Sequence, residues 1–121
     1  MTAPDAGRSG ARRGDVVLAK FPFTDLSAVK LRPAVVLATS GTSDVILAFI
    51  SSQLRSHVSA AEVLLHRSDP EFRESGLRVA SLIRLDRLVT LSDDLLLRRI
   101  GRLGPQTQLG VDAALRQVLS L

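Results

Sequence analysis

The chain lacks cysteine, tryptophan and tyrosine, and its only aromatic residues are four phenylalanines in 121 residues. Without cysteine there is no disulfide framework, no thiolate zinc site and no cysteine nucleophile. The two histidines, His57 and His66, are nine residues apart across an expected loop and strand edge, which does not indicate a metal pair. A glycine-rich phosphate loop and a G-x-S-x-G motif are also missing. The usual metalloenzyme and nucleotide-hydrolase interpretations therefore lose most of their support, and we expect no metal and no cofactor.

Long hydrophobic runs are missing as well. The longest apolar stretches, residues 33–38 and 45–50, have about six residues, far fewer than a bilayer requires. The first thirteen residues carry no apolar segment of the kind that a secretory signal needs. A hydrophobic content of 45% is nevertheless enough to fill a core. We expect a soluble cytoplasmic protein with a flexible tail over 1–13 and one folded domain over 14–121.

The charge is mildly positive, with 16 Lys and Arg against 12 Asp and Glu. Part of the excess lies before residue 14, and the rest of the chain has 13 basic and 11 acidic residues. Fourteen of the basic residues are arginine, whose planar guanidinium suits bidentate contact with phosphate. General codon bias produces the same richness, so charge alone leaves a nucleic-acid partner and simple solubility equally open.

Short apolar segments separated by turn residues predict strands. They are expected at residues 14–21, 34–38, 45–50, 62–65 and 79–91. In the last of these, Arg84 and Asp86 fall on one face about 6.6 Å apart, so they can pair with each other or hold a group between them. The connection over residues 22–31 is longer than a hairpin needs, which indicates a role beyond turning the chain.

Two helices are expected near the C-terminus. Ser92 is a plausible N-cap, and apolar residues at helical spacing follow it as far as residue 103. A second amphipathic helix follows Pro105, with the apolar residues Val111, Leu115, Val118 and Leu119. Strands first and helices last predict an α+β domain built on a small antiparallel β-barrel.

Two rim positions carry polar groups that could do chemistry. Arg32 precedes Pro33, which forces an extended backbone and holds the guanidinium at the edge of the sheet. There it is either a phosphate clamp or the partner of a nearby aspartate that closes the barrel end. The sequence Ser51, Ser52, Gln53 follows a buried strand and supplies neutral donors and acceptors, although such residues also simply end strands.

Four segments in register carry a family resemblance. They are GDVVLAKFPFTD at 14–25, KLRPAVVLAT at 30–39, FISSQ at 49–53 and SLIRLDRLVTLS at 81–92. IGRLG at 100–104 resembles the same family's final segment. Together, from about residue 14 to the C-terminus, the chain resembles the PemK/MazF family of bacterial toxins.

The resemblance implies an SH3-like barrel that forms a two-fold homodimer. It also implies metal-independent cleavage of single-stranded RNA, mRNA included, at short sequences, leaving a 2′,3′-cyclic phosphate and a 5′-hydroxyl. The implied partner is a cognate antitoxin whose acidic tail occupies the RNA groove.

Residue by residue, the arginine of the family's RP motif is Arg32, and the threonine of its strand-end motif falls on Ser51. The Arg-x-Asp of the PemK branch matches Arg84 and Asp86. Many members carry a glutamate in the first loop where this chain has Ser27. Asp25 lies two residues earlier, but no geometric reason supports it as a replacement for that glutamate. The expected RNA contacts are Lys30, Phe23, Thr24, Ser52 and Gln53.

RNA brings its own nucleophile, the 2′-hydroxyl, so the protein has to supply a base and a cation for the developing charge. We expect Asp86 to be the base, with Arg84 keeping it ionised and oriented. Arg32 would hold the non-bridging phosphate oxygens, and Ser51 would bind one of them. The alternative for Arg84 and Asp86 is a purely structural role, as an exposed ion pair that contributes about 0–1 kcal/mol to stability.

Two non-enzymatic alternatives stay open. One is a binding module of the same fold, such as a CcdB-like gyrase inhibitor, although CcdB-like proteins rely on a C-terminal tryptophan that this chain lacks. The other is an inactive homologue that binds RNA or its antitoxin without cutting, an interpretation that Ser27 keeps open.

Overall fold

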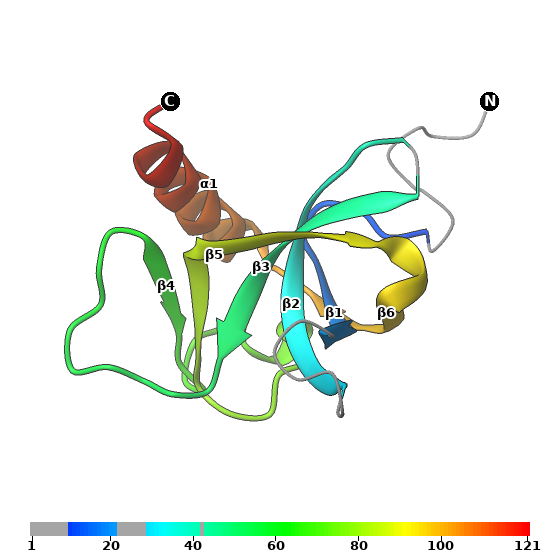
Figure 1. Cartoon of the computed structure of the whole chain (residues 1–121). Coiled ribbons are helices and arrows are strands. Elements are labelled where there is room, and N and C mark those ends of the chain that lie inside the picture. Colours follow the sequence, from blue (N-terminus) through cyan, green and yellow to red (C-terminus); the bar gives the residue numbers. More distant parts are fainter. Residues whose placement is uncertain (1–9, 22–28, 42) are drawn as a thin grey trace.

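A six-stranded antiparallel sheet forms the framework of the computed structural model, which describes residues 10–21, 29–41 and 43–121 (Figure 1). The strands, in chain order, are β1 (Asp15–Phe21), β2 (Lys30–Thr39), β3 (Asp44–Ser51), β4 (Glu62–Leu65), β5 (Ser81–Ser92) and β6 (Leu96–Arg102). Two 3-10 helices, η1 (Arg73–Ser75) and η2 (Asp93–Leu95), precede the terminal helix α1 (Pro105–Leu119). The spatial order is β4-β5-β3-β2-β1-β6, which confirms the predicted α+β class.

The sheet curves strongly but does not close. Within the described residues β4 pairs only with β5 and β6 only with β1, so these two strands remain the outer edges. The expected barrel is therefore an open, coiled sheet.

A sharp bend in β5 produces much of the curvature (Figure 1). The neighbouring residues Ala48 and Phe49 on β3 pair with Leu88 and Arg84, so residues 85–87 form an irregularity between them. Bulges of this kind increase the local twist and re-aim side chains. The two halves of β5 consequently run in different directions, and the first half also pairs with β4.

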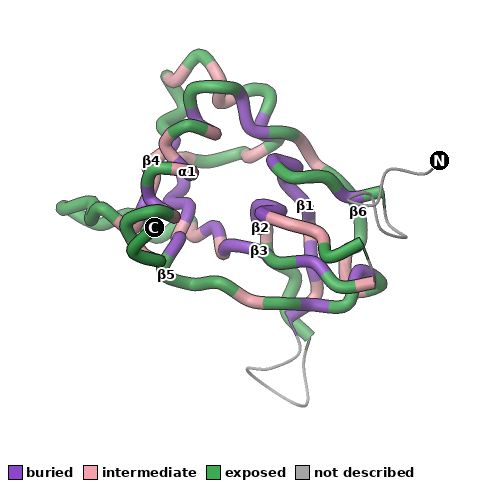
Figure 2. The backbone as a smooth tube through the Cα atoms, turned by 90° about the horizontal axis from the view of Figure 1, so that it is seen from above, coloured by how far each residue is buried: buried purple, intermediate pink, exposed green. Residues whose placement is uncertain are grey.

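Two apolar clusters hold the fold, because burying apolar surface is the dominant favourable contribution to folding. In one cluster Val111 and Ala114 of α1 pack on a set of strand residues that includes Val35, Ile83 and Leu85. The other lies among β1, β2 and β3. Figure 2 shows buried stretches of these strands in the middle of the molecule. The helix packs against β4 and β5, as the predicted terminal amphipathic helix requires.

The helix predicted over residues 92–103 is wrong. Ser92 ends β5, η2 follows, and the remaining residues form β6 along the free edge of β1. The edge of β1 offers backbone hydrogen bonds that outweigh a local helical pattern. At Gly101 the backbone of η1 comes so close that a Cβ would lie 2.2 Å from the carbonyl carbon of Ser75.

The segment before β1 makes several contacts. Ala11 is buried, and the Arg13 Nη1 donates to the backbone oxygen of Leu37 at 2.8 Å. Arg13 also forms an ion pair with Asp112 on α1. Of the expected tail over 1–13, residues 1–9 lie outside the described part of the chain. No helix in the described ranges is long and apolar enough to span a membrane.

Candidate functional site

A groove of about 1080 Å³ runs over one end of the sheet. Its walls come from β1, β2, β3, β5, β6 and the segments next to these strands, and among its described lining residues there is no aspartate or glutamate. Six arginines line it: Arg32, Arg78, Arg84, Arg87, Arg98 and Arg99. Such a concentration of one charge in a concave surface attracts anionic ligands.

Arg32 stands in the groove wall, as the sequence predicted for a rim position. It is exposed on β2, opposite Ala19 of β1, and Pro33 follows it. Among the residues that the structure describes, no carboxylate lies within ion-pair distance of its guanidinium. The alternative of an arginine locked to a nearby aspartate is therefore not what this part of the chain forms.

Ser51, Ser52 and Gln53 line the same groove at the end of β3. Arg32 and Ser51 each lie two residues beyond the paired Ala34 and Phe49, so the strand register carries both toward the same end of the sheet. The Ser51 hydroxyl accepts a hydrogen bond from the backbone N–H of Gln53 at 3.1 Å. That bond turns the chain and leaves Ser52 and Gln53 exposed.

Arg84 and Asp86 pair with each other, one of the two outcomes left open by the sequence. Arg84 Nε donates to Asp86 Oδ1 at 3.1 Å, and Nη2 donates to Oδ2 at 2.8 Å. Only 15% of the Arg84 side chain is exposed, against 39% for Asp86. The hydrogen bonds from Arg84 lower the pKa of Asp86, and the same carboxylate raises the pKa of Arg84. Arg84 lines the groove, whereas Asp86 is not among its lining residues.

A buried carboxylate that sequence reasoning missed completes this cluster. Glu62, the first residue of β4, has a fully buried side chain. Its Oε2 lies 3.4 Å from Arg84 Nε and 3.3 Å from Arg55 Nη1. The backbone N–H of Ser59 donates to Oε1 at 3.0 Å, and this bond is the main cause of the lowered pKa of Glu62, with the two guanidiniums acting the same way. A charged residue at the head of the apolar segment EVLL was the available signal.

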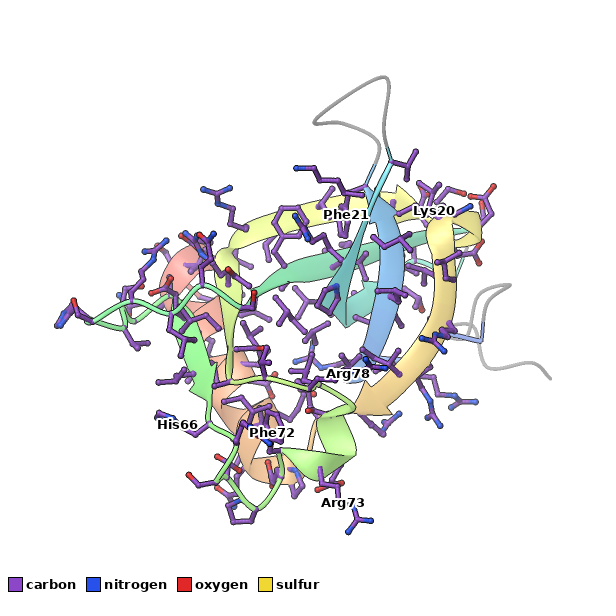
Figure 3. All side chains as sticks on the ribbon, turned by 90° about the horizontal axis from the view of Figure 1, so that it is seen from below. Lys20, Phe21, His66, Phe72, Arg73 and Arg78 are labelled. Carbon is purple, nitrogen blue, oxygen red and sulfur yellow. The ribbon has the colours of Figure 1, made fainter. Side chains whose placement is uncertain are left out.

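Four of the groove arginines were also missed, and two reasons account for three of them. Strict alternation along β5 puts Arg87 and Arg84 on opposite faces, but the irregularity at 85–87 brings both to the groove. Arg98 and Arg99 fell within the incorrectly predicted helix. Figure 3 shows Arg78 on the chain that leads from η1 to β5, whereas Arg73 of η1 points outward.

The other residues expected to contact RNA do not all lie at the groove. Lys30 is exposed at the start of β2 but does not line the groove. Phe23 and Thr24 lie outside the described residues, as do Asp25 and Ser27. Phe49 lines the groove while its ring packs edge-on against Phe21, with ring centroids 4.6 Å apart.

Metal-ligating side chains do not cluster in residues 10–21, 29–41 and 43–121, where no three His, Asp or Glu residues come together. The site therefore consists of guanidinium, hydroxyl and amide groups with the Arg84–Asp86 pair beside them. Groups of this kind bind phosphate through charge-assisted hydrogen bonds.

Solved structures share this fold. An endoribonuclease from a mycobacterial species, in complex with its cognate antitoxin, superimposes with a TM-score of 0.69 at 21% identity, covering 90% of this chain and 94% of the other. The Mycobacterium tuberculosis toxin MazF-mt6 gives 0.69 at 22% identity, with 88% and 97% covered. MazF in the Deinococcus radiodurans MazE-MazF complex gives 0.68 at 18% identity, with 90% and 95% covered.

The sequence comparison identifies the family. No curated protein matches the chain significantly. The profile of the PemK-like, MazF-like toxins of type II toxin-antitoxin systems, however, matches residues 12–119, which is nearly the whole chain. The chain therefore belongs to the PemK/MazF family of type II toxins.

Proposed function

We propose that the protein is an endoribonuclease that cleaves single-stranded RNA, mRNA included, without a metal ion. The observation that carries the proposal is the groove of about 1080 Å³, which six arginines line and which has no carboxylate among its described lining residues. A single-stranded phosphodiester chain needs such a track of positive charge. The similar mycobacterial protein, itself an endoribonuclease, adds support from fold and family.

The reaction needs a base, a proton for the leaving oxygen, and cations for the charge that develops on the phosphate. The RNA 2′-oxygen attacks the adjacent phosphorus, its proton passes to a base, and the bond from phosphorus to the 5′-oxygen breaks. The products are a 2′,3′-cyclic phosphate and a 5′-hydroxyl, the leaving 5′-oxygen taking up a proton from water. In the transition state negative charge accumulates on the non-bridging phosphate oxygens. Preorganised cations stabilise this charge and so lower the activation barrier.

Arg32 and Arg84 supply those cations in our proposal. Arg32 has no carboxylate partner in the described chain, so its N–H donors are available to phosphate. Ser51, at the same end of the sheet, adds a hydroxyl donor to one phosphate oxygen. Ser52 and Gln53 contact the neighbouring nucleotides, together with Lys30, Phe23 and Thr24 from the region around the first loop.

Asp86 is the proton acceptor. Its lowered pKa keeps it ionised at neutral pH, so the accepting form is always present. A carboxylate with a low pKa is a weak base, which makes the cationic contacts the larger contribution to the rate. The side chain of Asp86 is 39% exposed, so a 2′-hydroxyl can reach a remaining lone pair of a carboxylate oxygen beside the contacts with Arg84.

An acidic antitoxin tail is the partner that fits the same groove, because a run of carboxylates meets the same guanidiniums. The similar mycobacterial endoribonuclease and the Deinococcus radiodurans MazF both form complexes with antitoxins. By analogy with the family, we also propose a two-fold homodimer that acts in the cytoplasm, where mRNA is available.

A binding role without cleavage is the second candidate. It is favoured by Ser27, which stands where many family members have a glutamate. Such a homologue would hold RNA or its antitoxin in the groove, and a CcdB-like protein would instead bind gyrase.

The test is to incubate the purified protein with a mixed-sequence RNA and a chelator, and to determine the chemistry of both new ends. Cleavage with cyclic phosphate and 5′-hydroxyl ends is the expected result. Retention of intact RNA by the protein would favour the inactive homologue, and inhibition of gyrase supercoiling in a parallel assay would favour the CcdB-like role. Cleavage that the chelator abolishes would contradict the metal-independent mechanism.

A further inference from the structure

Glu62 places a buried carboxylate beside Arg84, which lines the groove. Its side chain is fully buried, and burying a carboxylate is costly unless it is paired and hydrogen-bonded. Oε1 accepts from the backbone N–H of Ser59, which satisfies the turn that leads into β4. Oε2 has no hydrogen-bond partner in the described chain and instead lies between two guanidiniums. The turn alone does not explain why this second oxygen is charged and buried there.

The position of Oε2 relative to Arg84 provides an explanation. Arg84 Nε lies 3.1 Å from Asp86 Oδ1 and 3.4 Å from Glu62 Oε2, so the guanidinium is held by a carboxylate from β5 and another from β4. An arginine has five N–H donors in a rigid planar fork. Two of them donate to Asp86, and the other three are engaged in no hydrogen bond within the described residues. Because Arg84 lines the groove, the orientation of the plane decides where these donors point.

The charges around Arg84 alternate in sign. Arg55, Glu62, Arg84 and Asp86 follow one another as cation, anion, cation and anion. Arg55 belongs to the chain that leaves the groove after Gln53, so Glu62 links that segment to Arg84 as well. Removing Glu62 would leave two neighbouring guanidiniums without the anion that separates them, and they would repel each other.

We propose that Glu62 is a positioning residue: it fixes the plane of the Arg84 guanidinium so that its unused N–H donors face the scissile phosphate. This inference rests on the proposed ribonuclease function and extends it by one residue that does not itself touch RNA. A group held within a fraction of an ångström of the transition-state geometry contributes far more than one that is free to rotate.

The test compares Glu62→Gln with wild type and with Glu71→Gln as a matched control. The control makes the same chemical change in a carboxylate that contacts Gln106 and Thr107 and, within the described ranges, no arginine. Single-turnover cleavage of a short RNA, normalised to the folded fraction from circular dichroism, gives the rate and the affinity separately. We expect Glu62→Gln to lower the cleavage rate constant about 100-fold. RNA affinity should be unchanged or slightly higher, because a negative charge near the groove has been removed.

A second measurement does not depend on cleavage. In wild type the Nε–H of Arg84 should give a distinct ¹⁵N–¹H NMR signal that exchanges slowly with water, identified by its loss in Arg84→Lys. In Glu62→Gln that signal should broaden or exchange at least ten-fold faster, and in Glu71→Gln it should not change. If the wild-type protein cuts no RNA, the ribonuclease proposal fails while this signal still tests whether Glu62 orders Arg84.

Several outcomes would overturn the inference. One is an unchanged normalised rate in Glu62→Gln, and another is an unchanged Arg84 signal in that variant. A loss of rate matched by an equal loss in Glu71→Gln would show a general structural effect. If Glu62→Gln does not fold, Glu62→Asp takes its place, since it keeps the charge but draws the carboxylate back by one methylene. The rate should then fall several-fold, and a wild-type rate would refute the positioning role.

Discussion

Arg84 and Asp86, two residues apart on β5, form a two-point ion pair with contacts of 3.1 and 2.8 Å. The pair lies at the irregularity where β5 changes direction, and Arg84 lines the groove while Asp86 is not among its lining residues. The proposed base and a proposed phosphate-binding cation are thus joined in one unit. In the proposed reaction this unit has to stay ionised for catalysis.

The pH dependence of cleavage tests that requirement. Because the pKa of Asp86 lies below the ordinary aspartate value of about 3.9, the carboxylate is ionised at neutral pH and remains mostly ionised as the pH falls toward that value. The rate constant should therefore be flat from pH 7 down to about 4.5 and fall only below that. Asp86→Asn should lower the rate by roughly 100-fold or more at every pH in this window. A rate that declines between pH 7 and 5 in wild type would contradict Asp86 as the base.

Groove arginines outside the pair should govern the salt dependence of RNA binding. For single strands the slope of log K against log salt is about −0.7 per phosphate neutralised. Arg98→Ala should therefore weaken RNA binding and reduce the slope by about 0.7. Arg67→Ala, which removes an exposed arginine outside the groove, should leave both unchanged. Fluorescence anisotropy over a salt series measures them, and equal slopes for all three proteins would place the RNA elsewhere.

The crossing of β6 over η1 should be the backbone contact that tolerates an added side chain least. At Gly76, with φ of 73°, a Cβ would lie 1.9 Å from the oxygen of Ile100, and at Gly101 a Cβ would lie 2.2 Å from the Ser75 backbone. Gly101→Ala should lower the free energy of unfolding by roughly 1–3 kcal/mol, because the backbone has to move apart. Gly110→Ala in α1, where a Cβ would meet Val63 at 3.7 Å, should raise it by about 0.5–1 kcal/mol.

Urea unfolding of the two glycine variants checks this prediction. A lower midpoint with an unchanged slope is expected for Gly101→Ala, and a higher midpoint for Gly110→Ala. If both variants were equally stable, the close approach of β6 and η1 would not exist in solution.

Glu71 should make the fold sensitive to acid. Its carboxylate accepts from the backbone N–H groups of Gln106 and Thr107 and from the Thr107 hydroxyl, so it caps α1 from a distant loop. The Thr107 hydroxyl is the main cause of its lowered pKa, followed by the backbone N–H of Gln106. A pKa lower in the folded than in the unfolded state gives stability that is present above about pH 4.3 and is lost as the pH falls through the folded value.

Melting temperatures at pH 7 and pH 3 test the cap. Wild type should lose stability over this interval, and Glu71→Gln should melt lower at pH 7 but lose less on acidification. Glu62 and Asp86 also have lowered pKa values and remain in the variant, so part of the acid sensitivity persists. Identical losses in the two proteins would mean that Glu71 does not titrate with folding.

The sequence predicted the parts of the fold that depend on local patterns. The strand at 62–65 has the predicted bounds, and the terminal helix begins at Pro105, where proline at the first turn is favoured. It failed at β6 because the spacing of Leu96, Ile100 and Leu103 suits a helix equally well. The pairing that makes β6 a strand is with β1, about eighty residues earlier, and a local pattern does not contain it.

The candidate site also contains residues that the local sequence predicts and residues that depend on long-range strand pairing. Arg32 and Ser51 stand at a proline-marked strand and at a strand end, and the sequence already placed both at the rim. Arg87 depends on an irregular pairing between β3 and β5, which strict alternation cannot reveal. Glu62 is part of the cluster only because β4 pairs with the first half of β5 and sets residue 62 opposite Arg84.

The central claim is that the guanidinium of Arg32, held at the rim of the groove, binds the phosphate that is cut. The most direct measurement compares wild type and Arg32→Ala in cleaving a mixed-sequence RNA with a chelator present. Wild type should give cyclic-phosphate products, and the rate for the variant should be at least about 100-fold lower. Circular dichroism and melting temperature should be unchanged, since Arg32 is exposed. Equal cleavage by the two proteins would contradict the account.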